Sequence, residues 1–98
     1  MKNRFGNEYD LDLGDEHWLQ FSRYEGEVSG ANIYHTKPDG TPCMGWVSFE
    51  GRAWANSFNG RIPTWKIVSE KPLTLTPDIL CKTCQDHAYV TNNRWIKS

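Results

Sequence analysis

Residues 81–87, Cys81-Lys82-Thr83-Cys84-Gln85-Asp86-His87, carry the strongest chemical signal in the sequence. Two cysteines separated by two residues allow both thiolates to converge on one ion, because the backbone between them turns back on itself. A structural zinc ion takes four ligands of this kind in a tetrahedron. The segment therefore predicts part of a metal site, for which the remaining ligands must come from elsewhere in the chain.

The third cysteine and two histidines are the other candidate ligands. Cys43 follows the turn formers at 38–40 and is expected in or beside a loop. The fourth ligand is either His87, which lies three residues beyond Cys84, or His35, which lies eight residues before Cys43. The spacing leaves this choice open. The predicted metal ligands are therefore Cys43, Cys81 and Cys84, completed by His87 or His35.

The site is predicted to be structural, because four protein ligands close a zinc site whereas three leave a position for water. The zinc deaminase signature is absent, since Leu80 rather than proline precedes Cys81 and no His-x-Glu occurs. The paired histidines of His-Glu-x-x-His are also absent. Only 15 residues are Leu, Ile or Val. A small domain with so few aliphatic residues often depends on a metal for stability.

Other interpretations of the cysteines remain open. The ion could be iron instead of zinc, or the cysteines could form a reduced, partly buried cluster with no ion. A redox role for the Cys81–Cys84 pair is disfavoured because the chain lacks the βαβ setting of such motifs. Asp86 and His17 are interpreted as solvated surface residues.

The rest of the chain has the pattern of a β-rich domain. Turn formers recur throughout, and the stretches between them are short and mostly β-branched or aromatic. The clearest hairpin runs through Ala88-Tyr89-Val90, turns near Asn92-Asn93 and returns through Arg94-Trp95-Ile96. A short helical turn is expected over residues 76–80, where a threonine can cap and a proline follows. The predicted fold is a small β-rich (or α+β) single domain, with short antiparallel hairpins around a zinc-ribbon-like metal site.

Composition and charge suggest the organisation of the chain. Residues 1–16 are polar, acidic and aperiodic, and we expect a flexible N-terminal segment there. Residues 17–98 are expected to form the single zinc-stabilised domain. The net charge of −1 lacks the basic excess typical of a protein that holds duplex nucleic acid. An odd number of cysteines favours a reducing, cytoplasmic location. No apolar run approaches the ~18–20 residues of a membrane span, so no membrane partner is predicted.

Aromatic residues are abundant, with 5 Trp, 4 Tyr and 4 Phe. Because aliphatic residues are few, most of the tryptophans are expected in the core. Trp54 is the best candidate for exposure. Together with Arg52 and Arg94, it could form a surface that stacks on bases or contacts a partner protein.

The C-terminal part of the chain resembles a family of small uncharacterised phage and prophage proteins. The resemblance rests on Pro72–Cys81, on Cys84-x-Asp86-His87, on the closing hairpin through Arg94-Trp95 and on the stretch Trp46–Arg52. It covers roughly residues 35–96. It implies a phage origin and implies that Cys81, Cys84 and His87 act together, and it carries no activity to this chain.

These observations lead to one functional hypothesis and two alternatives. The first is a zinc-binding module of phage type that acts by protein–protein contact, with a host or phage protein as partner, in the cytoplasm of an infected or lysogenic bacterium. It would modulate a host machine or a defence system. The alternatives are a nucleic-acid-binding zinc module and a small zinc-dependent hydrolase; for the first hypothesis we expect no catalytic residues.

Overall fold

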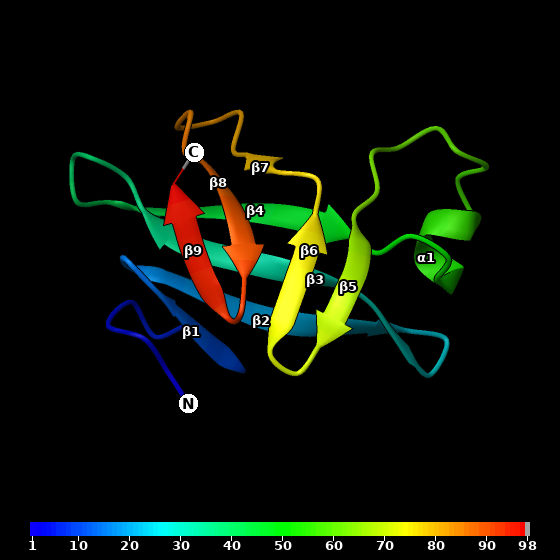
Figure 1. Ribbon diagram of the computed structural model, residues 1–98. Helices are drawn as coiled ribbons and strands as arrows, with labels where there is room; N and C mark the ends of the chain where they lie inside the picture. The colour runs from blue at the N-terminus through cyan, green and yellow to red at the C-terminus, as the bar shows by residue number, and fades with distance from the viewer. Residues whose placement is uncertain (98) are drawn as a thin grey trace.

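The computed structural model describes residues 1–97, and the regular secondary structure of this part of the chain consists of strands and one short helix (Figure 1). The prediction of a small β-rich domain with antiparallel hairpins is confirmed. In chain order the elements are β1 (Leu11–Gly14), β2 (His17–Tyr24), β3 (Glu27–Thr36), β4 (Pro42–Ser48), α1 (Ala53–Asn56), β5 (Lys66–Glu70), β6 (Leu73–Thr76), β7 (Ile79–Leu80), β8 (His87–Thr91) and β9 (Arg94–Lys97).

The strands form two layers. Strands β1, β2, β3 and β4 make one antiparallel sheet in that order. The hairpin β5–β6 and the small sheet β7–β8–β9 lie across one face of it. Figure 1 shows β5, β6, β8 and β9 crossing the strands of the larger sheet at a steep angle. The last hairpin turns at Asn92 and Asn93, whose φ angles are 51° and 62°, as the tightest hairpin turns require.

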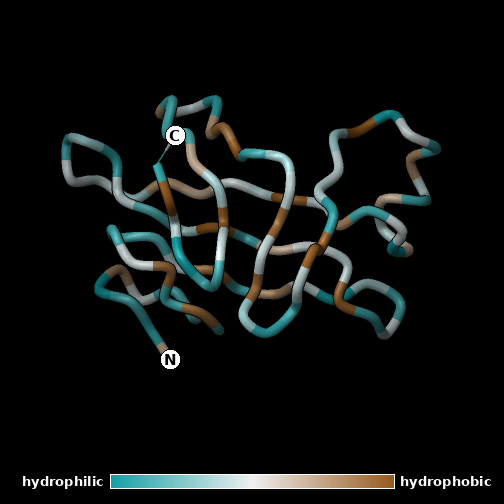
Figure 2. Tube along the Cα trace, in the orientation of Figure 1, coloured by the Kyte–Doolittle hydropathy of each residue, from teal (hydrophilic) through white to brown (hydrophobic). Residues whose placement is uncertain are grey.

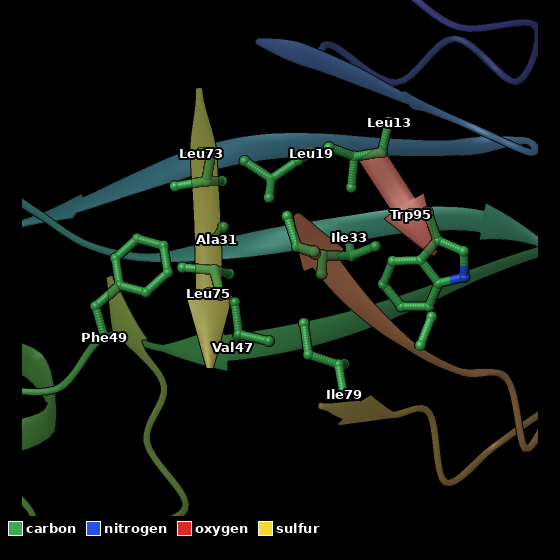
Figure 3. Packing of buried hydrophobic residues seen from close by; sticks show 12 residues of the cluster. Leu13, Leu19, Ala31, Ile33, Val47, Phe49, Leu73, Leu75, Ile79 and Trp95 are labelled. Atoms are coloured by element: carbon green, nitrogen blue, oxygen red, sulfur yellow. The ribbon is translucent and has the colours of Figure 1, made fainter. Parts of the chain in front are cut away.

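The hydrophobic core lies between the two layers (Figure 3). Alternate residues of each strand face inward, which is why Leu19, Ile33 and Val47 of the larger sheet are almost fully buried. Leu73 and Leu75 of β6 pack against them from the other layer. Apolar and polar residues accordingly alternate along the strands in Figure 2.

The first 16 residues contribute to this architecture. Leu11–Gly14 form β1 and pair with β2, and Leu13 is only 1% exposed. On the other face of the sheet, the Phe5 ring contacts Trp18 edge-to-face at 6.4 Å. The expected boundary at residue 16 therefore falls between β1 and β2, which pair with each other, and Leu13 on the N-terminal side of it belongs to the core.

The helical turn expected over residues 76–80 does not form. Thr76 ends β6, and Ile79 and Leu80 form β7, which pairs with Ala88 and His87 of β8. Thr76 and Pro77 favour the start of a helix, but an extended backbone places the Ile79 side chain in the core, and this burial outweighs the local preference. Among the described residues, no helix is long and apolar enough to cross a membrane.

Candidate metal centre

Two of the candidate ligands come from the end of the β3–β4 hairpin. His35 on β3 lies directly opposite Cys43 on β4 in the strand register. The connecting turn is fixed by the Lys37 N–H, which donates to the Thr41 carbonyl, and by the Asp39 carboxylate, which accepts from the Thr41 backbone N–H. The side chains of His35 and Cys43 therefore project from the same face of the sheet, toward the second layer.

The other two ligands come from a tight knuckle between β7 and β8. The Gln85 N–H donates to the Cys81 carbonyl at 2.7 Å, and the Cys81 N–H donates to the Asp86 carbonyl at 2.8 Å. Gln85 closes the loop with a φ of 64°, in the left-handed region. This fold-back brings the Sγ atoms of Cys81 and Cys84 to one side, as the two-residue spacing predicts.

The four side chains meet at one point. One ligand atom from each of His35, Cys43, Cys81 and Cys84 lies within 4.8 Å of all the others, and this group, here called the metal cluster, could hold a metal ion. The Cys43 and Cys81 Sγ atoms are 3.7 Å apart. A zinc–sulfur bond of about 2.3 Å places two tetrahedral sulfur ligands about 3.8 Å apart. The sulfur spacing therefore fits a tetrahedral ion.

The orientation of the His35 ring is fixed by the protein. Its Nδ1 lies 3.0 Å from the Ile33 carbonyl oxygen, which can only accept a hydrogen bond. Nδ1 therefore carries the proton, and Nε2 is left with a lone pair. Nε2 lies 3.2 Å from the Cys84 Sγ, inside the metal cluster. A backbone carbonyl that sets the tautomer in this way is a usual partner of a metal-ligating histidine.

The three thiols differ in acidity. Burial works against ionisation of Cys81, but the N–H groups of Cys84 and Thr83 outweigh it and lower the pKa of Cys81 to about 7. Burial raises the pKa of Cys43 to about 11, and the neighbouring thiols Cys81 and Cys84 add to this effect. Burial likewise raises the pKa of Cys84. One thiolate is thus available near neutral pH, and a bound cation would favour deprotonation of the other two.

His87, the other candidate for fourth ligand, lies outside the metal cluster. It begins β8, its side chain is 43% exposed, and its Nε2 bonds the carboxylate of Asp78. Of the two histidines that the spacing leaves open, the structure brings His35 to the cysteines. The strand register explains this outcome, because it aligns His35 with Cys43 across the seven residues that separate them.

His17 and Asp86 form a hydrogen-bonded pair beside the metal cluster, and no pattern in the sequence predicted it. His17 is 2% exposed, and its Nδ1 and Nε2 lie 2.6 Å from the Asp15 carbonyl oxygen and 2.5 Å from Asp86 Oδ2. Burial acts to raise the pKa of Asp86, but hydrogen bonding to His17 outweighs it and lowers that pKa. Both ring nitrogens of His17 therefore lie within hydrogen-bond distance of an oxygen, one from the backbone and one from a carboxylate.

The expectation that His17 and Asp86 are solvated surface residues is wrong. The His17 ring stacks on Trp95 at 4.2 Å and on His35 at 5.2 Å. A pattern in the sequence could have indicated its burial, because His17 occupies the same face of β2 as the core residue Leu19. No local pattern links it to Asp86, which is 69 residues away.

Two hollows border the metal cluster. A hollow of about 570 Å³ is lined by Cys84 together with the pair of His17 and Asp86. Cys81 is buried, whereas Cys84 is only partly covered. Cys43 is partly covered like Cys84, and His35 and Cys81 line a second hollow of about 240 Å³.

The residues predicted as a binding surface are distributed over the fold. Trp54 lies on α1, where its ring contacts those of Tyr24, Trp46 and Phe58 at centroid distances of 5.0 to 6.3 Å. This group is here called the aromatic cluster. Arg52 instead donates to the Val28 carbonyl and pairs with Glu70. Arg94 lies on β9 in the other layer.

No family model matches the chain, and no curated protein and no solved structure matches it.

Proposed function

We propose that the protein is a zinc-stabilised binding module that acts by contact with another protein. The observation that carries this proposal is the metal cluster, in which three thiols and one imidazole from both layers of the fold lie within 4.8 Å of one another. Three cysteines and one histidine form a common ligand set of structural zinc sites.

The donor set favours zinc. Thiolate and imidazole ligands in a tetrahedron suit Zn²⁺, whereas tetrahedral iron sites in proteins are usually built from sulfur alone. Four protein ligands would fill the coordination sphere and leave no position for a catalytic water. We therefore propose a structural ion and no hydrolytic activity.

The location of the metal cluster supports a stabilising role. His35 and Cys43 belong to the larger sheet, whereas Cys81 and Cys84 belong to the knuckle of the second layer. An ion bound to all four would join the two layers at one end. Residues 81–84 contain no strand of their own, so their backbone depends on such a link.

An exposed apolar face supports contact with a protein. Met44, Trp46 and Leu80 are large hydrophobic residues that are 54%, 39% and 48% exposed. All three line one hollow of about 240 Å³, and Trp46 also lines two further hollows. Tryptophan, tyrosine and methionine are enriched where proteins bind one another.

The origin and partner of the module follow from the resemblance and are part of the proposal. A phage-encoded protein of this kind would meet its partner, a host or phage protein, in the cytoplasm of the infected bacterium. Modulation of a host machine or a defence system is the role we propose for it.

Native mass spectrometry with and without a chelator tests the metal-dependent part of the proposal. We expect one zinc ion per chain, and we expect unfolding when the ion is removed. His87→Ala is the matched control for His35→Ala, and only the His35 variant should lose zinc. Purified protein that folds without any metal would contradict the proposal.

The contact surface is tested by affinity purification from a bacterial host. Trp46→Asp should lose a partner that the wild-type protein retains, because the substitution places a charge within the apolar face. Arg94→Gln on β9 is the matched control and should retain it. Equal recovery of the partner by both variants would contradict the proposed surface.

A further inference from the structure

A hollow of about 330 Å³ lies over the outer face of the larger sheet, beside the aromatic cluster. Its walls are the rings of Tyr24, Trp46 and Trp54, and its remaining lining residues are Ser22, Arg23 and Ser29. The hollow is at the lower end of the size range of ligand pockets, which are mostly apolar with a few polar groups. It is large enough for one ring-bearing side chain.

Ser29 supplies a polar group that the fold does not use. It is 1% exposed, and its Oγ is the one buried side-chain oxygen or nitrogen among the described residues that lacks a hydrogen-bond partner. A buried hydroxyl without a partner costs free energy, so it calls for an explanation. Because Ser29 lines the hollow, a ligand with a hydrogen-bonding end could supply the missing partner.

The backbone brings Ser29 to this position through an irregularity in the sheet. Ser22 pairs with Gly30 and Arg23 pairs with Val28, so Ser29 is an additional residue of β3 without a partner on β2. An insertion of this kind redirects a side chain and is common next to functional sites. The Phe49 N–H donates to the Ser29 carbonyl at 3.0 Å and holds the backbone in place.

The wall formed by Trp46 depends on Gly30. A Cβ built on Gly30 would lie 2.4 Å from Trp46 Cζ2, so the indole ring lies directly against the glycine backbone. The Trp46 Nε1–H donates to Ser48 Oγ at 2.8 Å, which fixes the rotation of the ring. The wall is therefore formed before any ligand binds, which lowers the entropic cost of binding.

The charges around the hollow restrict the ligand. Arg23 is the one charged residue that lines it, and its Nη1 donates to the Gly26 carbonyl within its own turn. Its remaining N–H groups suit a carboxylate, which arginine can bind through two parallel hydrogen bonds. Glu25 and Glu27 flank the same turn, so a nucleic-acid strand would meet no track of cations.

We propose that this hollow binds a tyrosine side chain from a partner protein, presented on an extended segment with an acidic residue next to the tyrosine. The tyrosine ring packs against Trp46 and Trp54, its hydroxyl hydrogen-bonds to Ser29 Oγ, and the acidic side chain pairs with Arg23. This inference rests on the proposed function, since it gives the chemistry of the partner.

Capped peptides test the proposal on the zinc-loaded protein. The probes are Ac-Ala-Glu-Tyr-Ala-NH2, its phenylalanine analogue and its glutamine analogue, and the readout is the chemical shift of the tryptophan indole N–H groups. For the wild-type protein we expect the phenylalanine analogue to bind about fivefold more weakly, which is the effect of one neutral hydrogen bond. The glutamine analogue should also bind more weakly.

Double-mutant cycles then assign each contact. Ser29→Ala should weaken the tyrosine peptide about fivefold and leave the phenylalanine peptide unchanged. The same variant should be at least as stable to heat as the wild type, because it removes an unpaired buried hydroxyl. A purely structural serine would not discriminate between the peptides. Arg23→Gln should abolish the preference for glutamate over glutamine, and Ser69→Ala and Arg94→Gln are the matched controls.

Several outcomes would overturn the proposal. It fails if no indole signal shifts at about 10 mM peptide, a concentration at which even a complex with a millimolar dissociation constant would be detected. It also fails if tyrosine and phenylalanine peptides bind equally, or if uridine monophosphate binds more tightly than the tyrosine peptide. The zinc content is measured on the same sample, so a failure here with zinc bound leaves the structural zinc ion standing.

Discussion

The two ends of the β3–β4 ladder are held in place by different kinds of contact. At one end His35 faces Cys43, and the inner face meets the cysteines of the knuckle. At the other end Gly30 faces Ser48, and the Trp46 ring covers the glycine on the outer face. The first end is specified by ligand chemistry, whereas the second depends on the absence of a side chain.

The largest effect is expected at the metal end. Chelation, or Cys84→Ser, should abolish cooperative unfolding, because zinc binding to small domains contributes about 10–16 kcal/mol and typical domains are stable by only about 5–15 kcal/mol. Circular dichroism during heating measures this. Returning zinc to the chelated wild-type protein should restore the transition, and an unchanged melting curve in chelator would contradict a structural ion.

The His17–Asp86 pair beside the metal cluster comes next. Asp86→Asn should destabilise the protein by about 1.5–3 kcal/mol, because the buried His17 ring would lose its hydrogen bond to a carboxylate. Urea unfolding measures the loss. Asp78→Asn is the matched control, since Asp78 pairs with an exposed histidine and should cost far less.

The difference in stability between the wild-type protein and Asp86→Asn should depend on pH. The pKa of Asp86 is lowered in the folded protein, so the stability it contributes is present above the usual carboxyl pKa of about 3.9. That contribution is lost as the pH falls through the lowered folded value. The gap between wild type and Asp86→Asn should therefore narrow in acid, and a gap that widens there would contradict the assigned His17–Asp86 pair.

The sequence predicted the parts of the metal end that depend on local spacing. Cys81 and Cys84 are a knuckle because two residues separate them, and the hairpin at Asn92 follows from its turn residues. The choice between His35 and His87 depended on the register of β3 and β4, which pairs His35 with Cys43 and which the local ligand spacing does not give. His17 and Asp86 meet only because the two layers pack together.

The aromatic end was harder to predict, for a related reason. Trp54 was the best candidate for exposure, but it is half-buried, and Trp46 is the tryptophan that is 39% exposed. The hollow beside them requires Trp46 to lie on Gly30 and Ser29 to occupy an extra position in β3. Both features depend on how two neighbouring strands align. A glycine in a strand indicates a close approach, yet it does not say which side chain approaches.

An intermediate effect is expected at Gly30. A Cβ there would lie 2.4 Å from Trp46 Cζ2 and 2.6 Å from the Val47 carbonyl oxygen. The ring could move, but the carbonyl belongs to the paired strand, so Gly30→Ala should cost about 1–3 kcal/mol. Gly45→Ala on the neighbouring strand is the matched control, because a Cβ at Gly45 meets no atom within 4 Å. Equal melting temperatures for the two variants would contradict this packing.

The smallest effect is expected at His87, and it separates the two candidate histidines. His87→Ala removes a pair in which both side chains are more than one third exposed, and such pairs contribute about 0.2–1 kcal/mol. The variant should keep its metal and melt close to the wild type, as measured by metal analysis and calorimetry on one sample. His35→Ala should lose the metal and melt at a lower temperature. The Ile33 carbonyl orients the His35 ring so that its Nε2 faces the Cys84 sulfur, and among the described residues no other imidazole is held in this way. If His87→Ala alone lost the metal, the knuckle would have to rearrange on metal binding. The fourth ligand would then be His87, as the Cys-x-x-Cys-x-x-His spacing allows, and not His35.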